Sequence, residues 1–144
     1  MLKGISPLLA PELLATMCRM GHGDELILAD AHFPGESFNQ NIIRADGLQI
    51  PDLLDGILPL FELDQYVDAP VFMMDIVPGD TADPVVEASY KEVLGKHCET
   101  VPTIAKVERF AFYEQTRNAF CVVMTGDTHK YGNLIIKKGV TPVA

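Results

Sequence analysis

The chain has 144 residues, of which 48% are hydrophobic and 22% charged, the composition of a folded domain with its own core. Its net charge of −9 and pI of about 4.7 argue against nucleic acid and anionic lipid surfaces as partners, because both carry negative charge. The longest apolar runs are strand-sized and the N-terminus has no signal-peptide pattern, so we expect neither a membrane span nor export.

No repeat, linker or low-complexity tract interrupts residues 1–144, which we therefore expect to form a single domain. Its three cysteines, Cys18, Cys98 and Cys121, are scattered and odd in number. This spacing favours free thiols over disulfides and predicts a cytoplasmic location, with Cys18 and Cys121 as buried filler.

Apolar periodicity predicts an alternation of helices and strands. A helix begins at Pro11 and presents Leu13 and Met17 on one face, and the run "LILA" (26–29) is typical of a strand buried on both faces. Further strands are expected at 41–43, 69–77, 103–107, 120–126 and 133–138, and further helices at 51–60, 83–96 and 112–119. Asp83 is expected to cap the third of these four helices. The alternation predicts an α/β fold, a three-layer domain with a mostly parallel central sheet flanked by helices.

Motifs for phosphate and metal binding are missing from the sequence. The "GHGDEL" segment lacks a third glycine and precedes a strand, whereas a dinucleotide-binding loop follows one. The four histidines, His22, His32, His97 and His129, include no pair at helix i, i+4 spacing, and there is no CxxC. We therefore reject phosphate-loop readings and do not expect a metal.

Polar residues near the expected strand ends are candidates for a site. His22 lies between two glycines and is either a general acid/base, with open backbone around it, or an exposed loop histidine. Asp30 ends a strand and is either a ligand for hydroxyl groups or a turn residue. Arg109 is either a five-donor fork for an oxygen-rich ligand or a solvated arginine, and the Tyr131–Gly132–Asn133 segment is either a binding loop or a turn. Together these groups indicate a neutral polyol ligand, weakly.

Several motifs in order resemble the fucose mutarotase/ribose pyranase family over almost the whole chain. They are "MLKGISPL", "MGHGDE", "ADAHFP", "RADG", "PLFELD", "RFAFYE" and "YGN" followed by "KKGVTP". The segments "AHFP", "RADG" and "RFAFYE" favour the fucose branch over the ribose branch. Ala10, where a capping serine is expected, departs from the pattern and concerns helix stability only.

This resemblance implies a cofactor-free isomerase that interconverts the α and β anomers of L-fucose. It implies His22 as proton donor, and Asp30, Arg109, Tyr131, Gly132 and Asn133 as sugar-binding residues. The alternatives are a D-ribose pyranase and a non-catalytic monosaccharide-binding protein. An apolar patch for the fucose methyl group would favour the L-fucose mutarotase over the pyranase, with Phe33, Phe110, Phe112 and Tyr113 as candidates.

One strand separates His22 from Asp30, so the two lie at its opposite ends, roughly 20–27 Å apart at about 3.3 Å per residue. A single sugar reaches both only if the "GHGD" loop folds over or if two subunits share a site. Because the family is oligomeric, we favour a ring-like homo-oligomer, such as a decamer, with sites at subunit interfaces. The "YGN" segment is then a candidate for the contribution from the neighbouring subunit.

Overall fold

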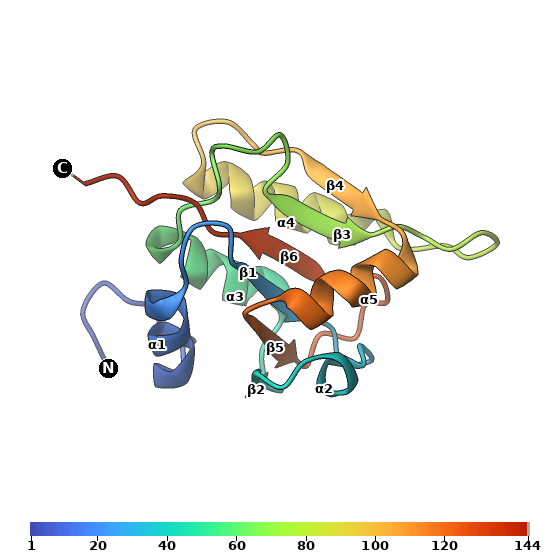
Figure 1. Cartoon of the computed structure of the whole chain (residues 1–144), viewed down its shortest axis with the longest axis horizontal. Coiled ribbons are helices and arrows are strands. Elements are labelled where there is room, and N and C mark those ends of the chain that lie inside the picture. The colour runs from blue at the N-terminus through green and yellow to red at the C-terminus, as the bar shows by residue number, and fades with distance from the viewer. Residues whose placement is uncertain (144) are drawn as a thin grey trace.

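The predicted alternation of helices and strands is present in the computed structural model, which describes residues 1–143 (Figure 1). The strands are β1 (Glu25–Ala29), β2 (Ile42–Ala45), β3 (Val71–Met74), β4 (Ile104–Val107), β5 (Cys121–Thr125) and β6 (Leu134–Lys137). The α-helices are α1 (Pro11–Arg19), α2 (Gly35–Phe38), α3 (Ile50–Ile57), α4 (Pro84–His97) and α5 (Arg109–Asn118), and a 3₁₀ turn, η1 (Leu58–Leu60), follows α3.

All six strands form one sheet in the order β2-β5-β1-β6-β3-β4. The pairs β2–β5, β5–β1 and β3–β4 are parallel, whereas β6 is antiparallel to both of its neighbours, β1 and β3. Five strands therefore run in one direction and only β6 opposes them, as its reversed arrow in Figure 1 shows. The expected α/β class and mostly parallel sheet are confirmed.

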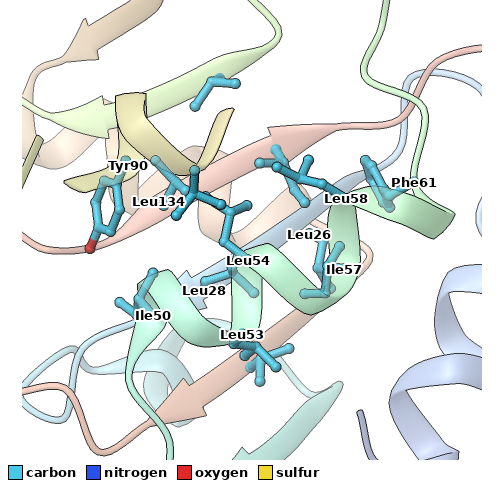
Figure 2. Close-up of a cluster of buried hydrophobic side chains, with 14 of the residues drawn as sticks. Leu26, Leu28, Ile50, Leu53, Leu54, Ile57, Leu58, Phe61, Tyr90 and Leu134 are labelled. Atoms are coloured by element: carbon cyan, nitrogen blue, oxygen red, sulfur yellow. The ribbon is translucent and has the colours of Figure 1, made fainter. Parts of the chain in front are cut away.

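Two hydrophobic clusters cover the two faces of the sheet, because successive side chains of a strand point to opposite faces. Leu26 and Leu28 of β1 belong to the cluster on the side of α1, α3 and α4 (Figure 2), whereas Ile27 and Ala29 belong to the cluster on the side of α2 and α5. All four are fully buried. Burial of each leucine or isoleucine contributes about 1.5–3 kcal/mol, so β1 anchors both layers.

Local capping explains where the helices begin. The Asp83 side chain accepts a hydrogen bond from the Val85 amide (3.0 Å) and caps α4 as predicted. α5 begins at Arg109, three residues earlier than predicted, because Glu108 accepts from the amides of Phe110 and Ala111. Ala10 makes no side-chain cap bond at α1.

One short helix was missed from the sequence, and one expectation about burial was wrong. The short helix α2 was missed, because four residues carry no periodic pattern. It packs beside α5, and its Gly35 lies close to the Met124 side chain of β5. Cys18 is exposed rather than buried, whereas Cys121 is buried as expected.

None of the described helices is both long and apolar enough to cross a bilayer, and the longest, α4, has 14 residues.

The sheet has two contrasting sides along the direction of its strands. The side of the sheet where the five parallel strands have their carboxyl ends is the carboxyl edge, and β6 begins there. The opposite side, where these strands begin, is the amino edge, and the chain before β1 lies there (Figure 1). Candidate residues occur at both edges.

Candidate functional site

A cavity of about 350 Å³ opens at the carboxyl edge of the sheet, where ligands gather in open α/β folds. It brings together Asp30, which follows β1, Arg109, which follows β4, and Tyr131 and Asn133, which precede β6. Four of the five predicted sugar-binding residues therefore line one pocket. Gly132 contributes backbone behind the pocket wall, where its carbonyl accepts a hydrogen bond from the Tyr90 hydroxyl.

Asp30 is the buried carboxylate of this pocket, with only 3% of its surface exposed. Burial raises the pKa of Asp30 above its ordinary value, against the lowering effect of the His32 amide, which donates to its Oδ1 at 2.9 Å. The backbone N–H of Asp30 in turn donates to Asn133 Oδ1 (2.8 Å). The carbonyl end of Asn133 is thus committed to the backbone, and its NH₂ end is the group that can serve a ligand.

We expect Asp30→Asn to keep the fold and to change how stability depends on pH. Because the pKa of Asp30 is raised on folding, the folded protein binds more protons than the unfolded chain between the ordinary and the raised pKa. The free energy of unfolding of the wild type relative to Asp30→Asn should therefore fall as pH rises through this interval and stay level above it.

Urea denaturation of both proteins between about pH 3 and 7 measures this difference. Asp75→Asn provides the control. Asp75 is exposed, and its side chain accepts a hydrogen bond from the amide of its neighbour Ile76. A difference between wild type and Asp30→Asn that is the same at every pH would contradict the buried, destabilised carboxylate.

Arg109 is held at the pocket rim by the start of α5. Its Nε donates to the Tyr113 hydroxyl at 3.1 Å, and its guanidinium carbon lies 5.4 Å from the centre of the Phe110 ring and 5.5 Å from that of Tyr113. The hydrogen bond with Tyr113 raises the pKa of Arg109, so the fork is permanently charged. The remaining donors of the guanidinium are available to oxygen atoms in the pocket.

The apolar wall of the pocket includes two of the four aromatic residues expected there. Phe33 and Tyr113 line it together with Pro34, Met74 and Val77. Phe112 is instead buried in the core on the α5 side, and Phe110 is 67% exposed beside Arg109.

The segment before β6 adopts an uncommon backbone conformation. Tyr131 has φ of 60°, in the left-handed region that side chains other than glycine rarely enter. A Cβ on the following Gly132 would lie 2.8 Å from the His129 carbonyl oxygen, so only glycine fits there. Strained residues of this kind cluster at binding sites, where the surrounding contacts hold them in place.

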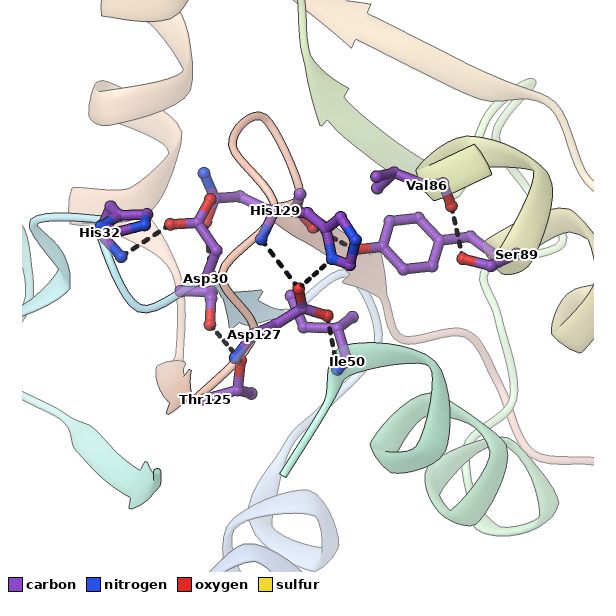
Figure 3. Close-up of polar contacts among 12 residues, drawn as sticks. Asp30, His32, Ile50, Val86, Ser89, Thr125, Asp127 and His129 are labelled. Carbon is purple, nitrogen blue, oxygen red and sulfur yellow. Dashed lines mark hydrogen bonds and ion pairs between the residues drawn. The ribbon is translucent and has the colours of Figure 1, made fainter. Parts of the chain in front are cut away.

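Asp127 and His129 fix the same loop from its other side, and sequence reasoning missed this role. Asp127 is 2% exposed and accepts hydrogen bonds from the Ile50 amide (3.2 Å) and from the amide (3.1 Å) and ring Nδ1 (2.7 Å) of His129. Figure 3 shows this pair next to Asp30 and His32. The loop that carries Tyr131 is thereby tied to the start of α3.

Three pocket residues besides the expected ones carry polar groups: His32, Asp80 and Lys130. His32 stands in the quoted segment "ADAHFP", two residues after Asp30, which was a usable signal. Asp80 lies in an ordinary Pro-Gly-Asp turn, and nothing in its local sequence points to the pocket.

His22 lies at the amino edge of the sheet, away from the pocket. Its Nε2 pairs with Asp64 Oδ1 at 3.0 Å, and its ring stands 5.3 Å from that of Tyr66. The next residue, Gly23, has φ of 89° and donates to the Lys138 carbonyl (2.8 Å), just past the end of β6. The loop is therefore held at the amino edge, and it does not fold over β1 to Asp30 in this chain.

The His22–Asp64 pair has the arrangement of an oriented acid/base. Asp64 is 4% exposed; burial opposes its ionisation, but hydrogen bonds from the Tyr66 amide and His22 hold its pKa below the ordinary value. The side chain of His22 remains 46% exposed. A buried carboxylate that orients an accessible imidazole leaves the other ring nitrogen free to exchange protons with a ligand.

Within residues 1–143, no three histidine, cysteine, aspartate or glutamate side chains lie together in a way that could hold a metal ion. The pocket groups available to a ligand are hydrogen-bond donors and acceptors of both charges beside an apolar wall. This combination suits a small polyhydroxylated molecule with one apolar face.

Comparison with known proteins agrees with this chemistry. A model of the RbsD / FucU transport protein family matches residues 3–141. The L-fucose mutarotases of Actinobacillus pleuropneumoniae serotype 5b and Histophilus somni strain 2336 are 57% and 54% identical over 143 residues, which is 99% of this chain and of each relative. The fucose mutarotase of Streptococcus pneumoniae, crystallised with L-fucose, has a TM-score of 0.92 and 43% identity over 98% of this chain and 100% of that one.

Proposed function

Because this chain belongs to the RbsD / FucU transport protein family, we propose that it is a mutarotase that interconverts the α and β anomers of L-fucose without a cofactor. The observation that carries the proposal is the pocket at the carboxyl edge, which gathers Asp30, Arg109, Tyr131 and Asn133 beside an apolar wall. The names of the full-length relatives favour L-fucose over the ribose pyranase alternative and catalysis over binding alone.

The two walls of the pocket match the two kinds of surface on this sugar. Asp30 accepts hydrogen bonds from hydroxyl groups, and Arg109 and the Asn133 NH₂ donate to hydroxyl oxygens. The 6-deoxy position of L-fucose is a methyl group, which loses contact with water against Phe33, Met74 or Val77. D-ribose has no methyl group and would leave this wall unused.

Anomer exchange requires two proton transfers. A proton is delivered to the ring oxygen while another leaves the anomeric hydroxyl, the bond between the anomeric carbon and the ring oxygen breaks, and an open-chain aldehyde forms. Rotation about the adjacent carbon–carbon bond and reclosure by the reverse steps yield the other anomer. His22 is the proton donor to the ring oxygen, and Asp64 orients its imidazole.

A site shared between two subunits accounts for the separation of His22 from the proposed sugar-binding residues. Within one chain His22 contacts Asp64 and Tyr66 at the amino edge, whereas Asp30 lies in the pocket at the carboxyl edge. A sugar of a few ångströms reaches both only if a neighbouring subunit supplies His22 to the pocket, or the pocket to His22. We therefore propose a ring-like homo-oligomer, with a decamer as the expected size. The "YGN" segment lies on the Asp30 side of this pairing.

The proposed location is the cytoplasm. Cys18, Cys98 and Cys121 are all free thiols, as is usual in a reducing compartment.

NMR saturation transfer between the α and β anomeric protons of L-fucose tests the proposed function. We expect catalytic amounts of protein at neutral pH to raise the exchange rate well above that of the sugar alone, and to raise it less for D-ribose run in parallel. Equal rates with and without protein, for both sugars, would leave a sugar-binding protein as the better description.

A further inference from the structure

Asp80 connects two loops of the pocket that are 50 residues apart in the chain. Its carboxylate accepts a hydrogen bond from Lys130 Nζ at 2.6 Å and from the Tyr131 hydroxyl at 2.7 Å. Bonds from Lys130, then Tyr131, and from the Thr81 amide lower the pKa of Asp80 to about 2. The carboxylate is therefore ionised throughout the pH range in which a cell works.

The turn that carries Asp80 is itself well defined. Gly79 has φ of 87°, and the Asp80 amide donates to the Val77 carbonyl at 3.1 Å. Val77, Asp80, Lys130 and Tyr131 all line the same pocket. The connection between β3 and α4 thus reaches across to the segment that precedes β6.

The hydrogen bond with Asp80 fixes the chemical character of Tyr131 as well as its position. A phenol has one proton with which to donate, and Tyr131 donates this charge-assisted hydrogen bond to the Asp80 carboxylate at 2.7 Å. The Tyr131 oxygen, which the Val77 backbone amide also approaches, is then left with only acceptor capacity for a ligand. Tyr131 presents an acceptor to the pocket, which suits the O–H of a sugar.

We propose that Asp80 is a positioning residue for sugar binding: it holds the strained Tyr131 in place and orients its hydroxyl as an acceptor. The inference rests on the proposed function for its substrate and adds a residue to the binding site. Asp80 acts through Tyr131, so its removal costs affinity and leaves the proton transfers by His22 unchanged.

A double-mutant cycle tests this assignment with L-fucose. Asp80→Ala and Tyr131→Phe are each expected to raise KM and the calorimetric Kd about 10-fold, near the top of the range for one hydrogen bond between uncharged groups, with kcat within about twofold of wild type. The double variant should bind no more weakly than Tyr131→Phe alone. Asp80→Asn keeps an acceptor for the phenol and should restore KM to within about threefold of wild type.

Asp75→Ala is the matched control, because it removes an exposed carboxylate from the same connection without touching Tyr131. Additive losses in the double variant would mean that Asp80 contacts the sugar directly, and would overturn the positioning role. An unchanged affinity of Asp80→Ala would also overturn the positioning role. An Asp80→Asn protein that binds L-fucose as weakly as Asp80→Ala would overturn it too, because the loss would then come from the unpaired charge of Lys130. If the wild type binds L-fucose but does not accelerate anomer exchange, the proposed function fails, and the Kd values alone decide the role of Asp80.

Discussion

The His22→Ala variant is expected to exchange L-fucose anomers ~10²–10⁴-fold more slowly than wild type, while its affinity for the sugar stays within about threefold. In the proposed mechanism the imidazole delivers the proton that opens the ring, whereas the groups proposed to hold the sugar lie in the pocket at the other edge of the sheet. Saturation-transfer NMR gives the exchange rate, and calorimetry with L-fucose gives the affinity. Asp64→Asn should show a smaller loss of rate, since it disturbs only the orientation of the ring.

A second His–Asp pair in the chain, one with an exposed carboxylate, provides a control for this experiment. His97 Nε2 lies 2.7 Å from Asp55 Oδ1, and neither residue lines the pocket or hydrogen-bonds to His22. His97→Ala therefore removes an imidazole from an exposed His–Asp pair and should leave the exchange rate unchanged. An active His22→Ala protein, or equal losses in the two variants, would remove His22 from the mechanism.

If subunits share the site, two variants that each lose one half of it, His22→Ala and Asp30→Asn, are expected to restore activity when mixed. His22→Ala retains an intact pocket, and Asp30→Asn retains an intact histidine. In a mixed oligomer some sites combine the two intact halves. With random assembly of equal amounts, about a quarter of the wild-type rate should return, because half of the histidines and half of the pockets are functional. Co-expression with two different tags, purification on both tags and the NMR exchange assay measure this recovery.

A mixture of His22→Ala with His22→Gln is the control, because neither partner supplies the imidazole. Recovery confined to the His22→Ala and Asp30→Asn mixture would support the interface site. Two results would reject it: no recovery in doubly tagged oligomers, or full activity in a wild-type monomer identified by sedimentation. The result also separates a shared site from a rearranged loop, since a loop that folds over β1 within one subunit gives no complementation.

Local sequence indicated every element except α2 and the 3₁₀ turn, and half of the residues that line the pocket. The continuous apolar run of β1 indicated burial on both faces, and the Asp83-Pro84 pair predicted the start of α4; both features depend on neighbours within one turn or one strand. Asp30 and Arg109 were found because they follow strands, whose carboxyl ends meet at one edge of a parallel sheet. The ordered motifs added the family, which is confirmed over residues 3–141.

Only the tertiary structure decided which of these residues meet. β6 runs antiparallel between β1 and β3, and this places Asn133 against the Asp30 amide although the two are 103 residues apart. Asp80 reaches Tyr131 over 51 residues and His22 reaches Asp64 over 42. Such hydrogen bonds join single side chains and leave no periodic pattern in either segment. They therefore cannot be predicted from the local sequence. They depend on strand order, which long-range packing of the two clusters determines.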